Sequence, residues 1–69
     1  MNDWIAARAR ALGVDDLKPE EIAQLLDLAG HAAHESGART NAPLLCYLLG
    51  RAGGERSLEE LAEIVRSTS

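Results

Sequence analysis

Two histidines near the middle of the sequence are the side chains best placed to do metal or proton chemistry. His31 and His34 are three residues apart, so a helix would bring them close together, and Asp27 lies one turn before His31, where it could orient its ring. A stable zinc site needs three or four protein ligands, and the nearest additions are Glu35 and Cys46. Because Cys46 falls in an apolar run, we expect a buried thiol and no metal site. The competing interpretation of the histidines is structural: polar residues on a helix flank, one of them covering terminal carbonyls.

No catalytic pattern accompanies these residues. The sequence contains no His-Glu-x-x-His motif, no Gly-rich phosphate loop and no Ser or Cys nucleophile with a base at motif spacing. A chain of 69 residues also offers little concave volume for an active site. We therefore expect a protein that is not an enzyme, with no catalytic residues and no cofactor.

Arg39 suggests a different chemistry, the binding of an anion. It stands just before the expected start of a helix at Asn41, where unpaired backbone N–H groups and the helix dipole favour negative charge. His34 could add positive charge as the pH falls. The sequence thus predicts a candidate anion site made of His34, Arg39 and Asn41. In the competing interpretation Arg39 pairs with Glu35 or covers helix carbonyls, so its guanidinium is not available to bind an anion.

Four amphipathic segments with their own start and stop signals are expected to position these residues. The first is a helix capped by Asp3 and ended by Gly13. The second runs from Pro19 to about Glu35, is the longest, and is expected to be central, with Gly37 closing it.

The third helix is expected from an Asn41 cap to about Arg51, and the fourth begins with the capping-box pattern of Ser57 and Glu60. Leucines surround so much of the third helix that we expect it to be largely buried. Val14 and Leu17, between the first two helices, are expected to reach the core.

Together these segments predict an all-α fold, a compact bundle of four short helices in a single helical domain over residues 1–69. No repeat or long linker divides the chain. At this length folding buries only about 60% of the extended-chain surface, so the core is small.

Charge and hydropathy exclude several classes of partner. The net charge of −4 repels a phosphate backbone, so we expect no nucleic acid to bind. No apolar run approaches the roughly 18 residues of a membrane span, and no signal-peptide pattern opens the sequence. We expect a soluble, cytoplasmic protein that binds no membrane.

Large apolar residues exceed what one packing stripe on each helix can hide. The interface candidates are Trp4, Leu44, Tyr47 and Leu48, although Tyr47 lies within a leucine run and is better explained as a core residue. This excess predicts either a homodimer or an apolar face that binds another protein.

Several of these positions recur in an order that resembles a known family. The residues that carry the resemblance are Trp4, Leu12-Gly13-Val14, Leu25 to Ala29, Ala33-His34, Arg39, Ala42-Pro43-Leu44, Tyr47-Leu48 and Gly50. They are similar to a small bacterial domain of unknown function that occurs alone or joined to molybdenum-cofactor guanylyltransferases, which attach a guanine nucleotide to molybdopterin. Gly30 departs from the charged residue expected there, and the turn at residues 36–38 differs in length from the usual form.

The resemblance implies a non-catalytic accessory module in molybdenum-cofactor biosynthesis, with a molybdenum-cofactor nucleotidyltransferase as its partner. It points to His34, Arg39, Asn41 and Pro43 as a functional surface. Two other functions stay open: a small anion- or nucleotide-binding protein that uses the start of the third helix, and a structural homodimer.

Overall fold

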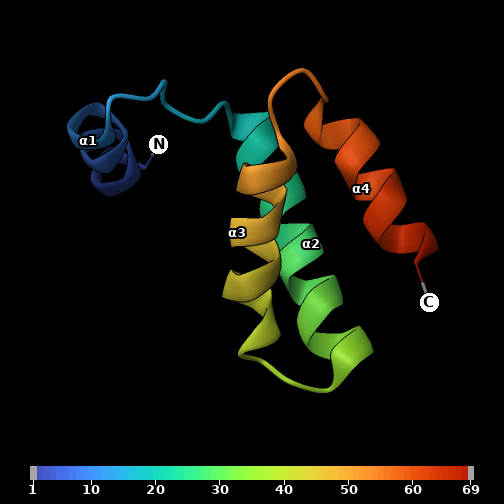
Figure 1. The fold of residues 1–69 in the computed structure, drawn as a ribbon. Coiled ribbons are helices and arrows are strands. Elements are labelled where there is room, and N and C mark those ends of the chain that lie inside the picture. The colour runs from blue at the N-terminus through green and yellow to red at the C-terminus, as the bar shows by residue number, and fades with distance from the viewer. Residues whose placement is uncertain (1, 69) are drawn as a thin grey trace.

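Residues 2–68 are described by the computed structural model, and this part of the chain contains four α-helices and no strand (Figure 1). The helices are α1 (Asp3–Leu12), α2 (Pro19–Ser36), α3 (Asn41–Ala52) and α4 (Leu58–Ser67). The predicted all-α fold of four short helices is confirmed. None of these helices combines the length and the hydrophobicity that crossing a bilayer requires.

Local signals set both ends of α1. The Asn2 side-chain oxygen accepts a hydrogen bond from the Ile5 N–H at 3.1 Å, so Asn2 is the N-cap and the prediction of Asp3 was wrong. Asp3 is instead the first helical residue, where its negative charge interacts favourably with the positive end of the helix dipole. Gly13 ends the helix as predicted, with a φ of 75° that a residue with a side chain rarely adopts.

The long helix α2 begins and ends where the sequence predicted. Pro19 occupies its first position, and the Lys18 N–H donates to the Glu21 carboxylate at 2.8 Å. Gly37 closes it with a φ of 71°.

The prediction of an Asn41 cap was wrong, because Asn41 is the first residue of α3 and Thr40 precedes it. The Asn41 N–H already donates to the Ala38 carbonyl at 3.0 Å, so the chain enters α3 through a hydrogen-bonded turn. In α4 half of the predicted capping box is present: the Ser57 hydroxyl accepts from the Glu60 N–H at 3.1 Å, while no return bond from the Ser57 N–H to the Glu60 carboxylate forms among residues 2–68.

The core lies where α2, α3 and α4 meet, with α2 central as predicted. Leu28 of α2 is fully buried, and Leu49 of α3 and Leu61 and Ala62 of α4 surround it. Leu25, Leu45, Leu58 and Val65 complete this cluster at its edges.

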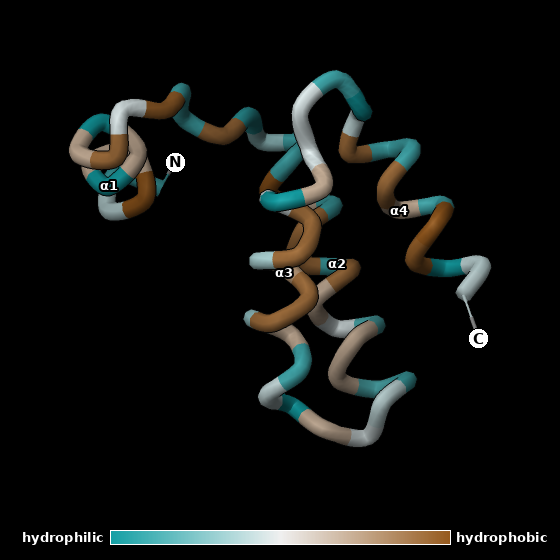
Figure 2. The backbone as a smooth tube through the Cα atoms, in the orientation of Figure 1, coloured by the Kyte–Doolittle hydropathy of each residue, from teal (hydrophilic) through white to brown (hydrophobic). Residues whose placement is uncertain are grey.

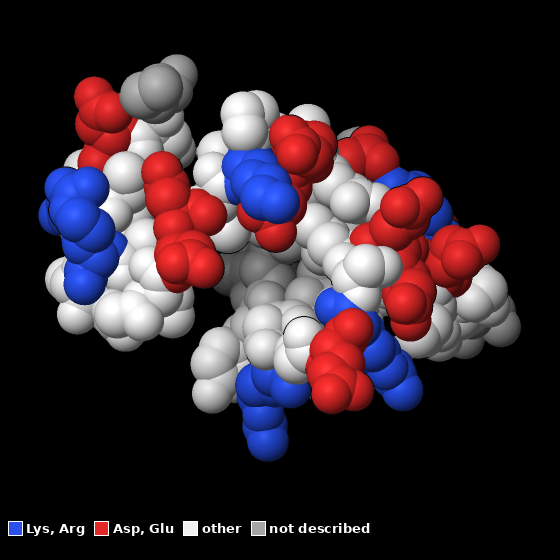
Figure 3. Space-filling view, turned by 90° about the horizontal axis from the view of Figure 1, so that it is seen from above, with Lys and Arg blue, Asp and Glu red and all other residues white. Residues whose placement is uncertain are grey.

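Helix α1 stands apart from the other three helices and packs against none of them. It lies on the far side of α3 from α4 (Figure 1) and forms a separate lobe in space-filling view (Figure 3). The connecting residues 13–18 are exposed, with 61% of Val14 accessible, so the expectation that Val14 and Leu17 reach the core was wrong. The Asp16 carboxylate accepts from the Leu17 N–H at 2.8 Å, a contact within the connection rather than with the core.

Candidate functional site

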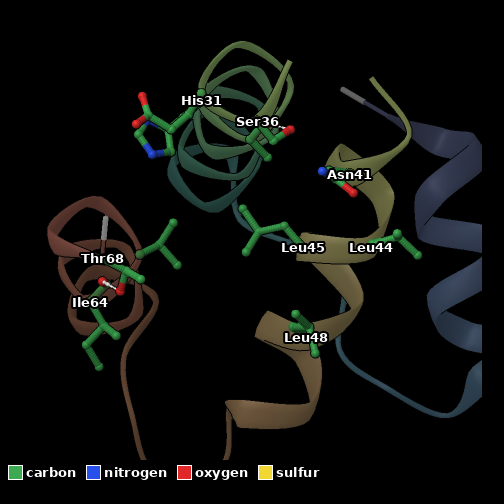
Figure 4. A pocket seen from close by; sticks show the side chains of 11 residues that line it. His31, Ser36, Asn41, Leu44, Leu45, Leu48, Ile64 and Thr68 are labelled. Carbon is green, nitrogen blue, oxygen red and sulfur yellow. Dashed lines mark hydrogen bonds between the residues drawn. The ribbon is translucent and has the colours of Figure 1, made fainter. Parts of the chain in front are cut away.

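An open apolar groove of about 390 Å³ lies between the C-terminal halves of α2 and α4 and the N-terminal half of α3 (Figure 4). Its apolar walls are Leu44, Leu45, Leu48, Ile64 and Val65. Leu44, Leu48 and Ile64 remain about half exposed because no further element covers them. The groove could therefore accept an apolar side chain from outside.

Polar side chains lie near the turn that connects α2 to α3, at one end of this groove. In Figure 4 Ser36 and Asn41 lie there, whereas His31 lies on the side of α2 toward α4, and Glu35 also lines the groove. Across the groove on α4, the Thr68 hydroxyl donates to the Ile64 carbonyl at 2.8 Å. No lysine or arginine lines the groove, so Glu35 gives it a negative end.

Asp27 does not orient His31 as the sequence suggested. Its carboxylate forms an ion pair with the guanidinium of Arg66, which ties α2 to the C-terminal half of α4. Both side chains remain largely accessible to water. This pair holds α4 against α2 beside the groove.

The three candidate anion-binding residues do not share one pocket. Asn41 lines the groove, whereas His34 and Arg39 are exposed and are not among the described residues that line it. Within residues 2–68 Arg39 forms no ion pair with Glu35, so the competing interpretation of that pair is not realised.

The structure does not cluster metal ligands. Nowhere between residues 2 and 68 do three or more His, Cys, Asp or Glu side chains come together as a metal ion would require. Cys46 is half buried, not fully buried as expected, and borders a small hollow near Leu25 and Leu49.

The outer face of α3, formed by Leu44, Tyr47 and Leu48, carries large apolar side chains in water. Their accessible fractions are 59%, 68% and 57%, and Arg51 lies 5.9 Å from the centre of the Tyr47 ring. The predictions that Tyr47 lies in the core and that this helix is largely buried were wrong. Apolar residues continue around α3 (Figure 2), but only Leu49 is fully covered, because α1 does not pack on the opposite side.

Helix α1 also exposes apolar surface. Trp4 is 63% accessible and Leu12 is 77% accessible. The Arg8 guanidinium lies 3.9 Å from the centre of the Trp4 ring, a distance typical of a cation–π contact. An open hollow of about 660 Å³ separates Trp4 from Pro19 and Ile22 of α2. Trp4 is thus available to a partner, and it and the outer face of α3 together contain all four interface candidates.

Sequence reasoning missed the contribution of α4 to the groove. Ile64, Val65 and Thr68 line it together with Ser36. The apolar face of α4 was readable from the sequence, but which helix it would meet was not. The signal that could have found Ile64 is its place at the edge of that face, where a side chain is only half covered.

Comparison with known proteins places the whole chain in one family. A family model described as "Domain of unknown function (DUF6457)" matches residues 1–69. No curated protein and no solved structure matches the chain.

Proposed function

Since the chain belongs to the DUF6457 family, whose function is unknown, we propose that it is a non-catalytic helical module that binds another protein. The observation that carries this proposal is the outer face of α3, where Leu44, Tyr47 and Leu48 are each more than half exposed. Contiguous apolar surface of this kind commonly marks a protein–protein contact. Tyrosine is also among the residues that most often dominate such contacts.

The partner we propose is a molybdenum-cofactor guanylyltransferase in the bacterial cytoplasm. The support comes from the sequence resemblance, which includes Leu44, Tyr47 and Leu48 among its residues. Two of these side chains also border the groove, so a partner on the outer face of α3 would lie next to it. In this role the module contributes binding surface, while the transferase performs the nucleotide chemistry.

Titration calorimetry with a molybdenum-cofactor guanylyltransferase tests the proposal. The natural chain should bind, and Tyr47→Glu should raise the dissociation constant by about 30-fold or more, as expected for an aromatic hot spot. Leu26→Glu is the matched control, because Leu26 is 68% exposed but lies on the opposite side of α2 from buried Leu28. Absence of binding, or equal losses in both variants, would overturn the proposal.

A second candidate function is the binding of a small anion or nucleotide at the start of α3. It is favoured by Arg39, which is exposed two residues before the helix and has no carboxylate partner among the described residues. The nearby Glu35 carboxylate, which lines the groove, opposes it. We therefore rank it below protein binding.

A further inference from the structure

Helix α1 is a well-capped helix whose large apolar side chains are not covered by the other three helices. It is capped by Asn2 and closed by Gly13, yet it packs against no other helix and leaves Trp4 and Leu12 mostly exposed. A helix of 10 residues is marginal in water unless an apolar face is packed. Helix α1 should therefore be more stable when its apolar side chains pack against another surface.

The groove between α2, α3 and α4 has the complementary properties. It is apolar along Leu45, Leu48 and Ile64, it is open to solvent, and Glu35 is the one acidic side chain among the residues of 2–68 that line it. Helix α1 carries Arg8, Arg10 and Asp3, a net charge of +1. Because the whole chain carries −4, the remainder carries −5. Figure 3 shows acidic side chains gathered over α4 and both basic and acidic side chains on the α1 lobe, so the complementary charge is that of Arg8 toward Glu35.

We propose that α1 of one copy of this chain docks in the α2–α3–α4 groove of a second copy, which returns the same contact. Trp4 enters the apolar part of the groove, and Arg8, already stacked on the Trp4 ring, lies near Glu35. Two identical contacts related by a twofold axis close the assembly at a dimer. The inference goes beyond the proposed function, because it uses α1 and the groove and does not require Tyr47.

The arrangement of the chain favours a second copy over the same copy as the source of α1. In Figures 1 and 4 α3 lies between α1 and α4, so α1 and its own groove are on opposite sides of α3. To fill its own groove, α1 would have to move around α3. The groove of a neighbouring copy requires no such movement, since α1 already points outward.

The single tryptophan makes the test direct. Sedimentation velocity of the full chain should show the 7.4 kDa monomer converting to a dimer as concentration rises. Over the same range the fluorescence of Trp4 should shift to shorter wavelength, because the indole leaves water. Trp4→Ala and Ile64→Glu should each raise the dissociation constant of the dimer by about 30-fold or more.

Mixing these two variants separates exchange of α1 from other modes of association. Trp4→Ala retains an intact groove and Ile64→Glu retains an intact α1, so the mixture should form a heterodimer at concentrations where neither variant associates alone. Arg8→Glu and Glu35→Arg should each weaken the dimer, and the chain with both changes should recover affinity. Urea unfolding of every variant should show that the core of α2, α3 and α4 stays folded, because none of these side chains belongs to the buried cluster.

Leu26→Glu is the control that should leave the dimer intact, and Tyr47→Glu should also leave it intact while weakening transferase binding. A monomer with exposed Trp4 at all concentrations would overturn the inference. A monomer whose Trp4 is buried independently of concentration would show docking on its own groove, which overturns it as well. A dimer that tolerates Trp4→Ala would place the interface elsewhere and have the same consequence.

Discussion

Asp27 of α2 and Arg66 of α4 are 39 positions apart in the sequence and form an ion pair across the surface of the core. Asp27 precedes the fully buried Leu28 in the chain, and Arg66 follows Val65, which packs at the edge of the same cluster. This ion pair joins α2 to α4 outside the buried apolar cluster.

Breaking this ion pair should have a small effect on stability. Both side chains are largely exposed, so water and salt screen the attraction, and such pairs contribute about 0.2–1 kcal/mol. A double-mutant cycle with Asp27→Asn and Arg66→Gln, measured by urea unfolding at low salt, should give a coupling free energy in this range. The coupling should shrink at about 1 M salt. A coupling well above 1 kcal/mol would show that the pair is more shielded than its exposure indicates.

Truncation of Leu28 should be far more costly. Leu28 is completely buried, and Leu→Ala at such a position costs about 2–5 kcal/mol from lost burial and the cavity left behind. In a domain of this size that loss is a large share of the total stability. Leu26→Ala, at a 68% exposed position of the same helix, should change the free energy of unfolding by less than about 0.5 kcal/mol. Similar costs for the two variants in urea unfolding would contradict the described core.

Two glycines of the α2 region should respond to alanine with opposite signs. Gly30 lies inside the helix with nothing within 4 Å of an added Cβ, so Gly30→Ala should stabilise by about 0.5–1 kcal/mol. Gly37 has a φ of 71°, so Gly37→Ala should be destabilising despite equally open surroundings. Thermal unfolding of the two variants checks the sign. A destabilised Gly30→Ala would indicate that another chain approaches Gly30 closely.

The anion-binding alternative predicts a local response around Arg39. An NMR titration with phosphate, pyrophosphate and GTP should shift backbone amides within residues 38–45, because these residues surround Arg39 and the start of α3. The shifts should disappear in Arg39→Ala, whereas Arg56→Ala, which removes an exposed arginine from the turn between α3 and α4, should leave them in place. Absent shifts at millimolar ligand, or shifts that survive Arg39→Ala, would leave Arg39 without a binding role.

The sequence by itself determined which segments are helical and nearly where each one ends. The signals that set the helix ends act within a single turn, so their effects can be predicted from neighbouring residues. Gly13 and Gly37 act through a positive φ, Pro19 through its fixed φ, and Ser57 through one side-chain hydrogen bond. The cap predictions failed by one residue in the same direction, because the N-cap is Asn2 rather than Asp3 and Thr40 rather than Asn41. In both places two adjacent polar residues compete for one position, and at α3 the hydrogen-bonded turn from Ala38 to Asn41 precedes the helix.

Only the tertiary structure decided which apolar faces are covered. Tyr47 and Leu49 lie in one leucine-rich run, but α2 and α4 cover one side of α3 while α1 leaves the other side open. The groove likewise needs Leu45 and Ile64, which are brought together by the angle between two helices. Helix periodicity predicts that one face of a helix is apolar. Which other helix covers that face depends on contacts between residues distant in the chain, such as Asp27 with Arg66.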